Sequence, residues 1–440
     1  MIEYRDLRIA ILGAGSVGAQ VARLLLEHNR ELSDRVGAGL DLVGIAVRDL
    51  DAPRTADIPQ ELLTTDAHSL ILGADIVIEL MGGIEPAREY LELALTSGAD
   101  VITANKALLA THGRELFRIA EQVGAQLYYE AAVGGAIPII RPLRDSLAGD
   151  RVRRILGIVN GTTNYILDRM DTEGDSLEDA LAAATALGYA EADPTADIGG
   201  FDAAHKAAIL ASLAFHTTVP LESVHREGIE HVTHAQVEGA KAAGYVVKLL
   251  AVCERLTDPV TGQEGVAARV HPALVPHGHP LAAVRGVNNA VFVEAEAAGP
   301  LMFYGAGAGG VQTASAVLGD LVSAARRHVI GGPGITEPTR SEVPVLPIAS
   351  VVTRYQITLQ VADRPGVLAT IANLFSEHDV SVEAVQQSVP DGAEGEAVAT
   401  ATLVIGTHRA TEAALAATVA ALEASDVVTE VTSVLRVEGL

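Results

Sequence analysis

Short apolar runs alternate with longer helix-forming segments over the first 130 residues. The apolar runs are typical of buried strands and lie at residues 7–13, 42–47, 75–80, 101–103 and 125–130. The helix-forming segments lie at residues 16–27, 86–97 and 107–122. Because repeated strand–helix units with apolar strands form parallel sheets covered by helices, residues 1–139 are predicted to be an α/β domain with a Rossmann-type doubly wound parallel sheet.

The pattern changes over residues 140–310, where helical and β-rich segments are mixed. Ser176 fits a helix N-cap and Gly188 fits a helix end, which predicts a helix over 176–188. Strands are predicted at 265–271 and 290–297, and a helix at about 311–330 is expected to return to the first domain. The mixture predicts a second, α+β domain.

The C-terminal part is predicted to be a third module. Prolines and glycines mark residues 331–352 as a linker. Residues 353–440 then read as strand, helix, strand, strand, helix and strand, the order of a ferredoxin-like module. The acidic loop at 390–397 is expected to solvate the hairpin beside it.

Composition limits the classes of partner. The chain has 440 residues, 49% of them hydrophobic and 20% charged, which suits about three domains of roughly 150 residues each. A formal charge of −25 argues against nucleic acid or an anionic membrane as partner, because both would repel the protein. No apolar run reaches the roughly 20 residues that span a bilayer, and the N-terminus does not resemble a signal peptide. The single cysteine, Cys253, reads as a core residue and favours a reducing cytoplasm.

The stretch GAGSVG at 13–18 has the GxGxxG spacing directly between a predicted strand and a helix. Gly13 would allow the tight turn, Gly15 would let a pyrophosphate approach the backbone, and Gly18 would let helix and strand pack closely. The start of the helix, at Ser16 and Val17, would offer free N–H groups to the phosphates. We therefore predict a dinucleotide site.

The residues after the second predicted strand bear on the choice of dinucleotide. An acidic residue there favours NAD, whereas an arginine can pair with the 2′-phosphate of NADP. Arg48 comes first, Asp49 follows and Arg54 is close behind. NADP is therefore the favoured cofactor, and NAD remains possible.

Four further stretches carry candidate chemistry. Lys106 follows a strand at the edge of the sheet where α/β enzymes bind ligands, although a lysine there is more often surface charge. The glycine-rich residues 130–139 fit a buried crossing and a backbone cradle for a ligand or cation equally well. Residues 160–167, NGTTNYIL, suit helix caps but also substrate binding. Residues 188–206 gather carboxylates before Lys206 at a helix start.

Three histidines lie together in HPALVPHGHP, at 271, 277 and 279. Prolines break any helical face there, and no carboxylate is interleaved, so we interpret the stretch as a proline-rich connector and not as a metal site.

Seven motifs, in order along the chain, resemble the homoserine dehydrogenase family. They are GAGSVG, VITANKALLA, EAAVGGAIPII, GIVNGTTNYIL, LGYAEADPTADIGGFDAAHKAAILA, HPLAAVRGVNNA and YGAGAGG. The tail resembles an ACT domain through DRPGVLATIANLF. The resemblance covers essentially the whole chain. It implies NAD(P)-dependent interconversion of L-aspartate 4-semialdehyde and L-homoserine, in threonine, methionine and isoleucine biosynthesis, with residues 140–310 as a catalytic and dimerisation domain.

The resemblance also implies roles for individual residues. Glu191 would bind the substrate amino group, and Asp202 with Lys206 would lie near the reacting oxygen, with Lys206 as proton donor. Asp202 and Lys206 are four residues apart and so share one helical face. Lys106 matches the family's other active-site lysine, which contacts substrate and cofactor, and Gly305 lies in a glycine loop against the cofactor. A sodium or potassium ion would be held, mostly by backbone oxygens, at Glu130, Val133, Gly135 and Ile137.

The tail is expected to bind a regulatory amino acid. By resemblance L-threonine is the effector, held at the turn formed by Asp363, Gly366, Val367 and Leu368. The turn before the next strand commonly carries Asn-Ile-Ser but here has Asp379, which accepts hydrogen bonds and cannot donate as an amide does. A dimerisation module without an effector is therefore the alternative.

A homodimer or homotetramer is expected, from the resemblance and because the β-rich middle segment would otherwise expose a sheet edge. Two other functions remain open: a dehydrogenase for another amino-acid semialdehyde, and a non-catalytic sensor of NAD(P) and an amino acid.

Overall fold

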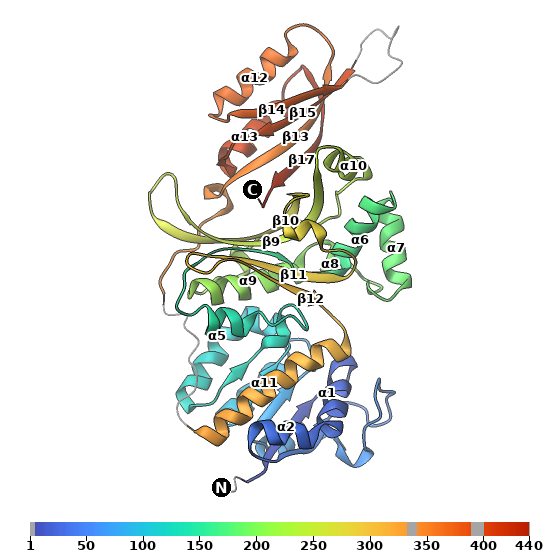
Figure 1. Cartoon of the computed structure of the whole chain (residues 1–440), viewed down its shortest axis with the longest axis vertical. Helices are drawn as coiled ribbons and strands as arrows, with labels where there is room; N and C mark the ends of the chain where they lie inside the picture. Colours follow the sequence, from blue (N-terminus) through green and yellow to red (C-terminus); the bar gives the residue numbers. More distant parts are fainter. Residues whose placement is uncertain (1–4, 332–340, 389–399, 440) are drawn as a thin grey trace. The chain divides into compact units, whose positions relative to one another are not determined.

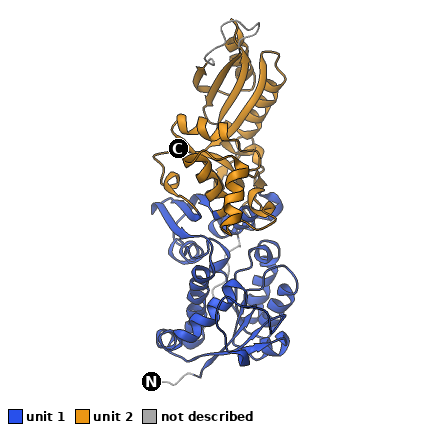
Figure 2. Ribbon diagram, turned by 90° about the vertical axis from the view of Figure 1, so that its right-hand side faces the viewer, with its two compact units in different colours: residues 1–161, 202–224, 287–342 blue, residues 162–201, 225–286, 343–440 orange. Residues whose placement is uncertain are grey.

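The computed structural model describes residues 5–331, 341–388 and 400–439. The chain divides into two compact units, coloured separately in Figure 2. Unit 1 comprises residues 1–161, 202–224 and 287–342, and unit 2 comprises residues 162–201, 225–286 and 343–440. The acidic loop predicted at 390–397 and residues 332–340 of the predicted linker lie outside the described residues.

Unit 1 contains the predicted doubly wound sheet. Its six strands are all parallel and have the order β3-β2-β1-β4-β5-β6. The strands are β1 Leu7–Leu12, β2 Leu40–Ala46, β3 Leu63–Thr64, β4 Ile76–Glu79, β5 Asp100–Thr103 and β6 Leu127–Tyr128. This is the Rossmann strand order, and it places the topological switch point between β1 and β4, where such sheets bind ligands. The predicted fold class is confirmed.

Three of the five helices of this part agree closely with prediction. They are α1 Ser16–Glu27, α2 Asn29–Val36, α3 Ala67–Leu72, α4 Ala87–Thr96 and α5 Lys106–Val123. Helix α2 was not predicted, because most of its residues are polar and only Leu32 and Val36 are buried. The six-residue α3 and the two-residue β3 were also not predicted. The strand predicted over 125–130 was too long: the chain turns into a short 3₁₀ helix at Glu130–Ala132.

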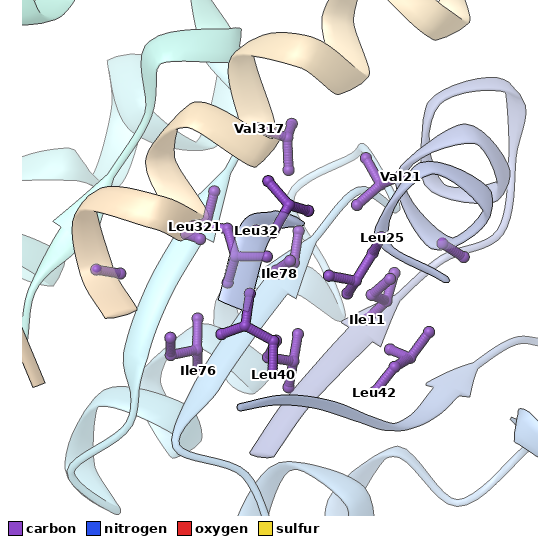
Figure 3. Packing of buried hydrophobic residues seen from close by; sticks show 14 of the residues in the cluster. Ile11, Val21, Leu25, Leu32, Leu40, Leu42, Ile76, Ile78, Val317 and Leu321 are labelled. Carbon is purple, nitrogen blue, oxygen red and sulfur yellow. The ribbon is translucent and has the colours of Figure 1, made fainter. Parts of the chain in front are cut away.

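A helix distant in sequence completes this layer. Figure 1 shows α11, Gly310–Ile330, lying beside α1 and α2. Its Val317 and Leu321 are fully buried against strand residues such as Ile76 and Ile78 (Figure 3). Among the described helices, none is long and apolar enough to cross a membrane.

The remainder of unit 1 is a small antiparallel group of strands with one buried helix. Strand β11, Asn288–Ala295, pairs with β7, Val152–Ile158, and with β12, Gly299–Ala306. A short π-helical turn at Pro142–Ser146 precedes β7. Helix α9, Phe201–Phe215, is rich in alanine and buried along most of its length, which allows close packing on several sides.

Unit 2 begins with helices and continues into long strands. The helices are α6 Gly161–Thr172, α7 Leu177–Ala186, α8 Thr195–Ile198 and α10 His234–Ala242, and the strands are β8 His225–Arg226, β9 Tyr245–Thr257 and β10 Glu264–Pro276. The predicted cap is confirmed, because Ser176 accepts a hydrogen bond from the Asp179 N–H. Cys253 is fully buried in β9, as expected.

The proline-rich connector predicted around His271 is wrong. His271 and Pro272 lie inside β10 and are paired along β9. The other edge of β10 pairs with β8 up to Val270 and with β17 from Ala273 onward. Pro272 therefore lies between the residues that pair with β8 and those that pair with β17. No strand needs a hydrogen bond from its backbone at that position, so the N–H that proline lacks is not required.

The tail has the predicted strand and helix order. Its strands are β13 Val352–Ala362, β14 Val382–Ser388, β15 Thr400–Thr407, the short β16 Ala410–Thr411 and β17 Val428–Val437, and its helices are α12 Val367–Glu377 and α13 Glu412–Glu423. The strands β17-β13-β15-β14 are antiparallel neighbours in that order, which is the ferredoxin-like arrangement.

The burial of α11 yields a test of the fold. Leu321→Ala is expected to destabilise the protein by about 2–5 kcal/mol, because it leaves a cavity between α11 and the parallel sheet. The midpoint of thermal unfolding of the first transition measures this change. Leu72→Ala is the control, since Leu72 is 62% exposed on α3. Equal midpoints for the two variants would contradict the position of α11.

Candidate active site

The glycine loop after β1 has the geometry that its spacing predicts. Gly13 has a φ of 99°, and a Cβ there would lie 2.8 Å from the Leu80 carbonyl oxygen. A Cβ on Gly18 would lie 2.0 Å from the Gly13 carbonyl oxygen, so only glycine lets α1 pack this close to the strand. Gly15 has open space around its missing side chain. The loop is therefore packed tightly against the protein at Gly13 and Gly18 and has free space at Gly15.

Two further glycine-rich segments meet this loop. A Cβ on Gly310, at the start of α11, would lie 2.5 Å from the Ser16 carbonyl oxygen. A Cβ on Gly135 would lie 2.5 Å from the Gly307 carbonyl oxygen. The segments 13–18, 134–137 and 305–310 therefore converge at backbone distance. Gly305 itself lies in β12, paired with Asn289, and not in the loop where it was expected; the loop begins at Gly307.

A cleft of about 600 Å³ opens beside the glycine loop, at the carboxyl ends of β1, β2 and β4. Gly13, Gly15, Arg48, Asp49 and Arg54 are among its lining residues. The Arg54 guanidinium is already occupied by the carbonyl oxygens of residues 49, 50 and 52. Arg48 is exposed and makes no hydrogen bond or ion pair with the described residues. Arg48 is therefore the arginine whose guanidinium is available to a ligand.

A buried carboxylate that the sequence reading missed shapes the wall of this cleft. Glu79, at the end of β4, is fully buried; its Oε1 accepts from the N–H of Met81 at 2.7 Å and its Oε2 from the Thr103 hydroxyl at 2.6 Å. Thr103 Oγ1 accepts from the Asn105 N–H, and the Asn105 side chain caps α5. The side-chain amide of Asn105 also donates to the carbonyl of Gly83. This network fixes the start of α5, where Lys106 is the first residue.

Lys106, Asp202 and Lys206 form the centre of the candidate site, here called the lysine–aspartate–lysine cluster. Asp202 Oδ1 lies 2.7 Å from Lys106 Nζ, and Asp202 Oδ2 lies 2.7 Å from Lys206 Nζ. Lys206 Nζ also donates to the Val159 carbonyl at 2.5 Å, and Asn160 donates to Asp202 Oδ2 at 3.0 Å. Asp202 and Lys206 share one face of α9, as the spacing predicts.

The exposure of these groups differs. The side chains of Asp202 and Lys206 are about nine-tenths buried, whereas that of Lys106 is 43% exposed. Burial alone would favour the neutral acid, but the ammonium groups of Lys206 and Lys106 hold the pKa of Asp202 well below its usual range. Asp202 is therefore a permanent carboxylate between two cationic groups.

The residues expected to hold a cation form a buried turn. Val133, Gly135 and Ile137 are buried, and no hydrogen bond within the described residues ends on their carbonyl oxygens. The Glu130 carboxylate is fully engaged by the N–H groups of residues 139–141 and by the Arg141 guanidinium. Only its carbonyl could therefore serve a cation. Buried carbonyls without donors are uncommon, and a hard cation is one group that satisfies them.

Asp320 lies directly beside this turn and was also missed. Its Oδ2 accepts from the Glu130 N–H at 2.8 Å, and it is 1% exposed. Burial raises the pKa of Asp320 to about 7, which Arg141 opposes and Glu130 reinforces. No sequence pattern marks Asp320, because it lies 190 residues away on α11.

Glu191 is not among the residues that unit 1 brings together. It is an exposed residue of unit 2, in the loop between α7 and α8. This loop is held to α6: the Thr162 hydroxyl donates to the Tyr189 carbonyl at 2.7 Å, and the rings of Tyr165 and Tyr189 are in edge contact.

The expected regulatory turn joins β13 to α12 in the tail. Gly366 has a φ of 96° and precedes the helix, Val367 is buried, and Asp363 and Leu368 are exposed. Asp379, the departure from the family pattern, has a φ of 57°. This left-handed conformation is tolerated best by glycine, asparagine and aspartate, so Asp379 suits the turn in which it lies.

The glycine geometry yields a matched pair of variants. Gly15→Ala is expected to fold with unchanged thermal stability but to bind the nicotinamide dinucleotide at least about tenfold more weakly, since a methyl group meets no protein atom and blocks the pyrophosphate. Gly18→Ala is expected to lower the thermal midpoint as well, because its methyl group meets the Gly13 carbonyl. Calorimetry and dinucleotide titration measure both. Tight binding by Gly15→Ala would contradict this placement of the dinucleotide.

Comparisons with known proteins support one family along the whole chain. The family model "Homoserine dehydrogenase, NAD binding domain" matches residues 13–130, the model "Homoserine dehydrogenase" matches residues 138–322, and the model "ACT domain" matches residues 355–426. Homoserine dehydrogenase of Mycobacterium tuberculosis is 54% identical over 440 residues, covering 99% of each chain. That of Corynebacterium glutamicum is 52% identical over 432 residues, covering 98% of this chain and 95% of the relative.

Solved structures agree. A homoserine dehydrogenase from Thiobacillus denitrificans superposes with a TM-score of 0.90 at 38% identity, covering 99% of both chains. A hyperthermophilic archaeal homoserine dehydrogenase, solved in complex with NADPH, has a TM-score of 0.61 at 29% identity and covers 74% of this chain and 99% of its own. With its glycine loop, its lysine–aspartate–lysine cluster and relatives that match from end to end, this chain belongs to the homoserine dehydrogenase family.

Proposed function

We propose that this protein catalyses the NAD(P)-dependent interconversion of L-aspartate 4-semialdehyde and L-homoserine. The observation that carries this proposal is the lysine–aspartate–lysine cluster, which lies on α5 and α9. The start of α5 is tied through Asn105 to the loop at Gly83, next to the dinucleotide cleft. Reduction of an aldehyde needs a hydride donor and a positioned acid side by side, and the two sites supply both.

The dinucleotide fits the glycine loop. Ser16, Val17 and Gly18 begin α1, where the first N–H groups have no partner within the helix and face a phosphate favourably. When bound, the reduced nicotinamide supplies the hydride that attacks the aldehyde carbon.

Lys206 is positioned to protonate the oxygen on which negative charge then develops. An ammonium group has three N–H donors. In Lys206, two of them reach the Val159 carbonyl and Asp202, which leaves one for the substrate oxygen. Lys106 uses one donor on Asp202 and keeps two. Two ammonium groups around one carboxylate leave one net positive charge, which stabilises an alkoxide in a poorly solvated site.

Asp202 would orient both lysines and stay ionised while the proton moves. Glu191 is proposed to bind the substrate amino group, since it is an exposed carboxylate on a loop that α6 holds in place.

NADP is the proposed preferred cofactor, with NAD as the alternative. Arg48 lies in the cleft beyond β2 with its guanidinium unengaged, and such an arginine pairs well with a 2′-phosphate. The archaeal relative solved with NADPH is consistent with this choice.

A sodium or potassium ion is proposed at the carbonyl oxygens of Glu130, Val133, Gly135 and Ile137. The unpaired buried carbonyls of this turn support it. Bound there, the ion would hold the segment 134–137 against the segment 305–310, which in turn contacts Ser16 of the glycine loop.

The tail is proposed to bind L-threonine at Asp363, Gly366, Val367 and Leu368, next to the start of α12.

A homodimer or homotetramer is proposed because β12, an edge strand among the described residues, exposes apolar side chains such as Met302 and Tyr304. The single, buried cysteine is consistent with a cytoplasmic location.

The test of this function is the initial rate of NADPH and of NADH oxidation with L-aspartate 4-semialdehyde, with and without L-threonine. Turnover is expected with both cofactors and faster with NADPH, and Arg48→Ala is expected to lower kcat/KM for NADPH by about tenfold while leaving that for NADH within about twofold. A decrease in rate with L-threonine is expected from the tail.

Lys206→Met tests the role of Lys206 as proton donor, because methionine fills the volume of the lysine stem but carries no ammonium group. It is expected to lower kcat at least about 100-fold with unchanged NADPH affinity. Turnover only with another semialdehyde would favour a related dehydrogenase, and dinucleotide binding without any turnover would favour a non-catalytic sensor.

A further inference from the structure

The start of the helix that carries Asp202 and Lys206 is held by a neighbouring segment of unit 2. Residues 198–201 lead directly into Asp202, and residues 225–229, here called the link segment, pack against them. The Ile229 N–H donates to the Ile198 carbonyl at 2.7 Å. A Cβ on Gly228 would lie 2.2 Å from that same carbonyl oxygen, so the two backbones touch.

Arg226 makes the principal side-chain contacts of the link segment with this helix start. Its guanidinium donates to the Gly199 carbonyl. It also stacks on the Phe201 ring, with the guanidinium carbon 3.5 Å from the ring centroid. Phe201 is the first residue of α9 and is next to Asp202 in the chain. Arg226 therefore holds both the turn before the helix and its first residue.

The next residue, Glu227, contacts the C-terminal module instead. Its Oε2 accepts from Arg436 at 2.8 Å, and its Oε1 lies 2.7 Å from His225 Nε2. Two successive residues therefore have different partners: Arg226 contacts Gly199 and the first residue of the catalytic helix, and Glu227 contacts Arg436 of the tail.

Arg436 is firmly built into the tail. Its guanidinium makes two further hydrogen bonds to the Glu412 carboxylate, at 2.8 and 2.9 Å, and Glu412 also accepts from the Tyr355 hydroxyl. Arg436 lies on β17, which pairs with β13 inside the module and, at residues 436 and 437, with β10. A shift of β17 would therefore move the partner of Glu227.

We infer that the link segment couples the C-terminal module to the catalytic helix, with Arg226 and Glu227 as positioning residues for Asp202 and Lys206. The connection runs from Arg436 through Glu227 and Arg226 to residues 199–201 and then along the chain to Asp202. The effect of this coupling on catalysis rests on the function proposed above. The physical coupling does not depend on that function.

Hydrogen–deuterium exchange of the full chain tests the coupling without any need for turnover. Glu227→Gln keeps the shape of the side chain and removes its charge, and the hydrogen bonds described for the Glu227 carboxylate go to His225 and Arg436. Amide exchange across residues 199–206 is nevertheless expected to become about threefold faster in this variant, while residues 208–214 of α9 stay unchanged.

Glu383→Gln is the matched control. Glu383 forms a pair with Arg354 at 2.9 Å elsewhere in the tail, and its side chain is 44% exposed, compared with 43% for Glu227. This variant is expected to leave exchange at 199–206 unchanged. An unchanged rate at 199–206 in Glu227→Gln, an equal effect of Glu383→Gln, or uniformly faster exchange across unit 2 would each overturn the coupling.

Arg226 supplies the kinetic readout. Arg226→Leu is expected to lower kcat about tenfold with NADPH affinity within about twofold, because the helix start loosens while the glycine loop is untouched. Arg226→Lys, which keeps the charge but not the planar stacking, is expected to recover part of this loss. If the variants show the expected exchange but the wild-type protein never turns over, only the proposed function is refuted. An unchanged kcat in Arg226→Leu would refute the positioning role.

Discussion

The candidate site depends on one carboxylate held between two ammonium groups. Asp202 gives one oxygen to Lys106 and the other to Lys206, and without it two like charges would face each other in a largely buried site. The surrounding fold serves this arrangement. The Glu79 and Asn105 network fixes the start of α5, and the link segment packs against the start of α9. Asp202 also lies in the first turn of α9, where a negative charge is favoured by the helix dipole.

Much of the fold could be predicted because its strongest signals are local. Apolar strands and glycine spacing identified the doubly wound sheet, and Ser176 identified a helix start. The failures have physical reasons. Helix α2 is mostly polar and is stabilised by the packing of Leu32 and Val36, which tertiary structure supplies. Pro272 argued against a strand. It lies in β10 at a position that neither β8 nor β17 pairs with, and only the pairing of distant strands reveals such a position.

The site could be predicted in part. Asp202 and Lys206 are four residues apart, so their proximity follows from the helix. Lys106 joins them from about 100 residues away, and only the motif resemblance connected the three. Glu79 and Asp320 were missed, since nothing in a sequence separates a buried carboxylate from an exposed one. The converging glycine segments show the same limit. Each reads as a turn, yet their close contacts at Ser16 and Gly307 arise from the tertiary fold.

The role of this carboxylate is tested by the single-turnover rate of NADPH oxidation, with saturating aldehyde, in Asp202→Asn. Asparagine keeps the size of the side chain but carries no charge, so it cannot hold two ammonium groups together. The rate is expected to be lower by about 100-fold or more, with NADPH affinity within about twofold of wild type. A rate within about twofold of wild type would contradict this role of Asp202, because the carboxylate would then have no part in organising the two lysines.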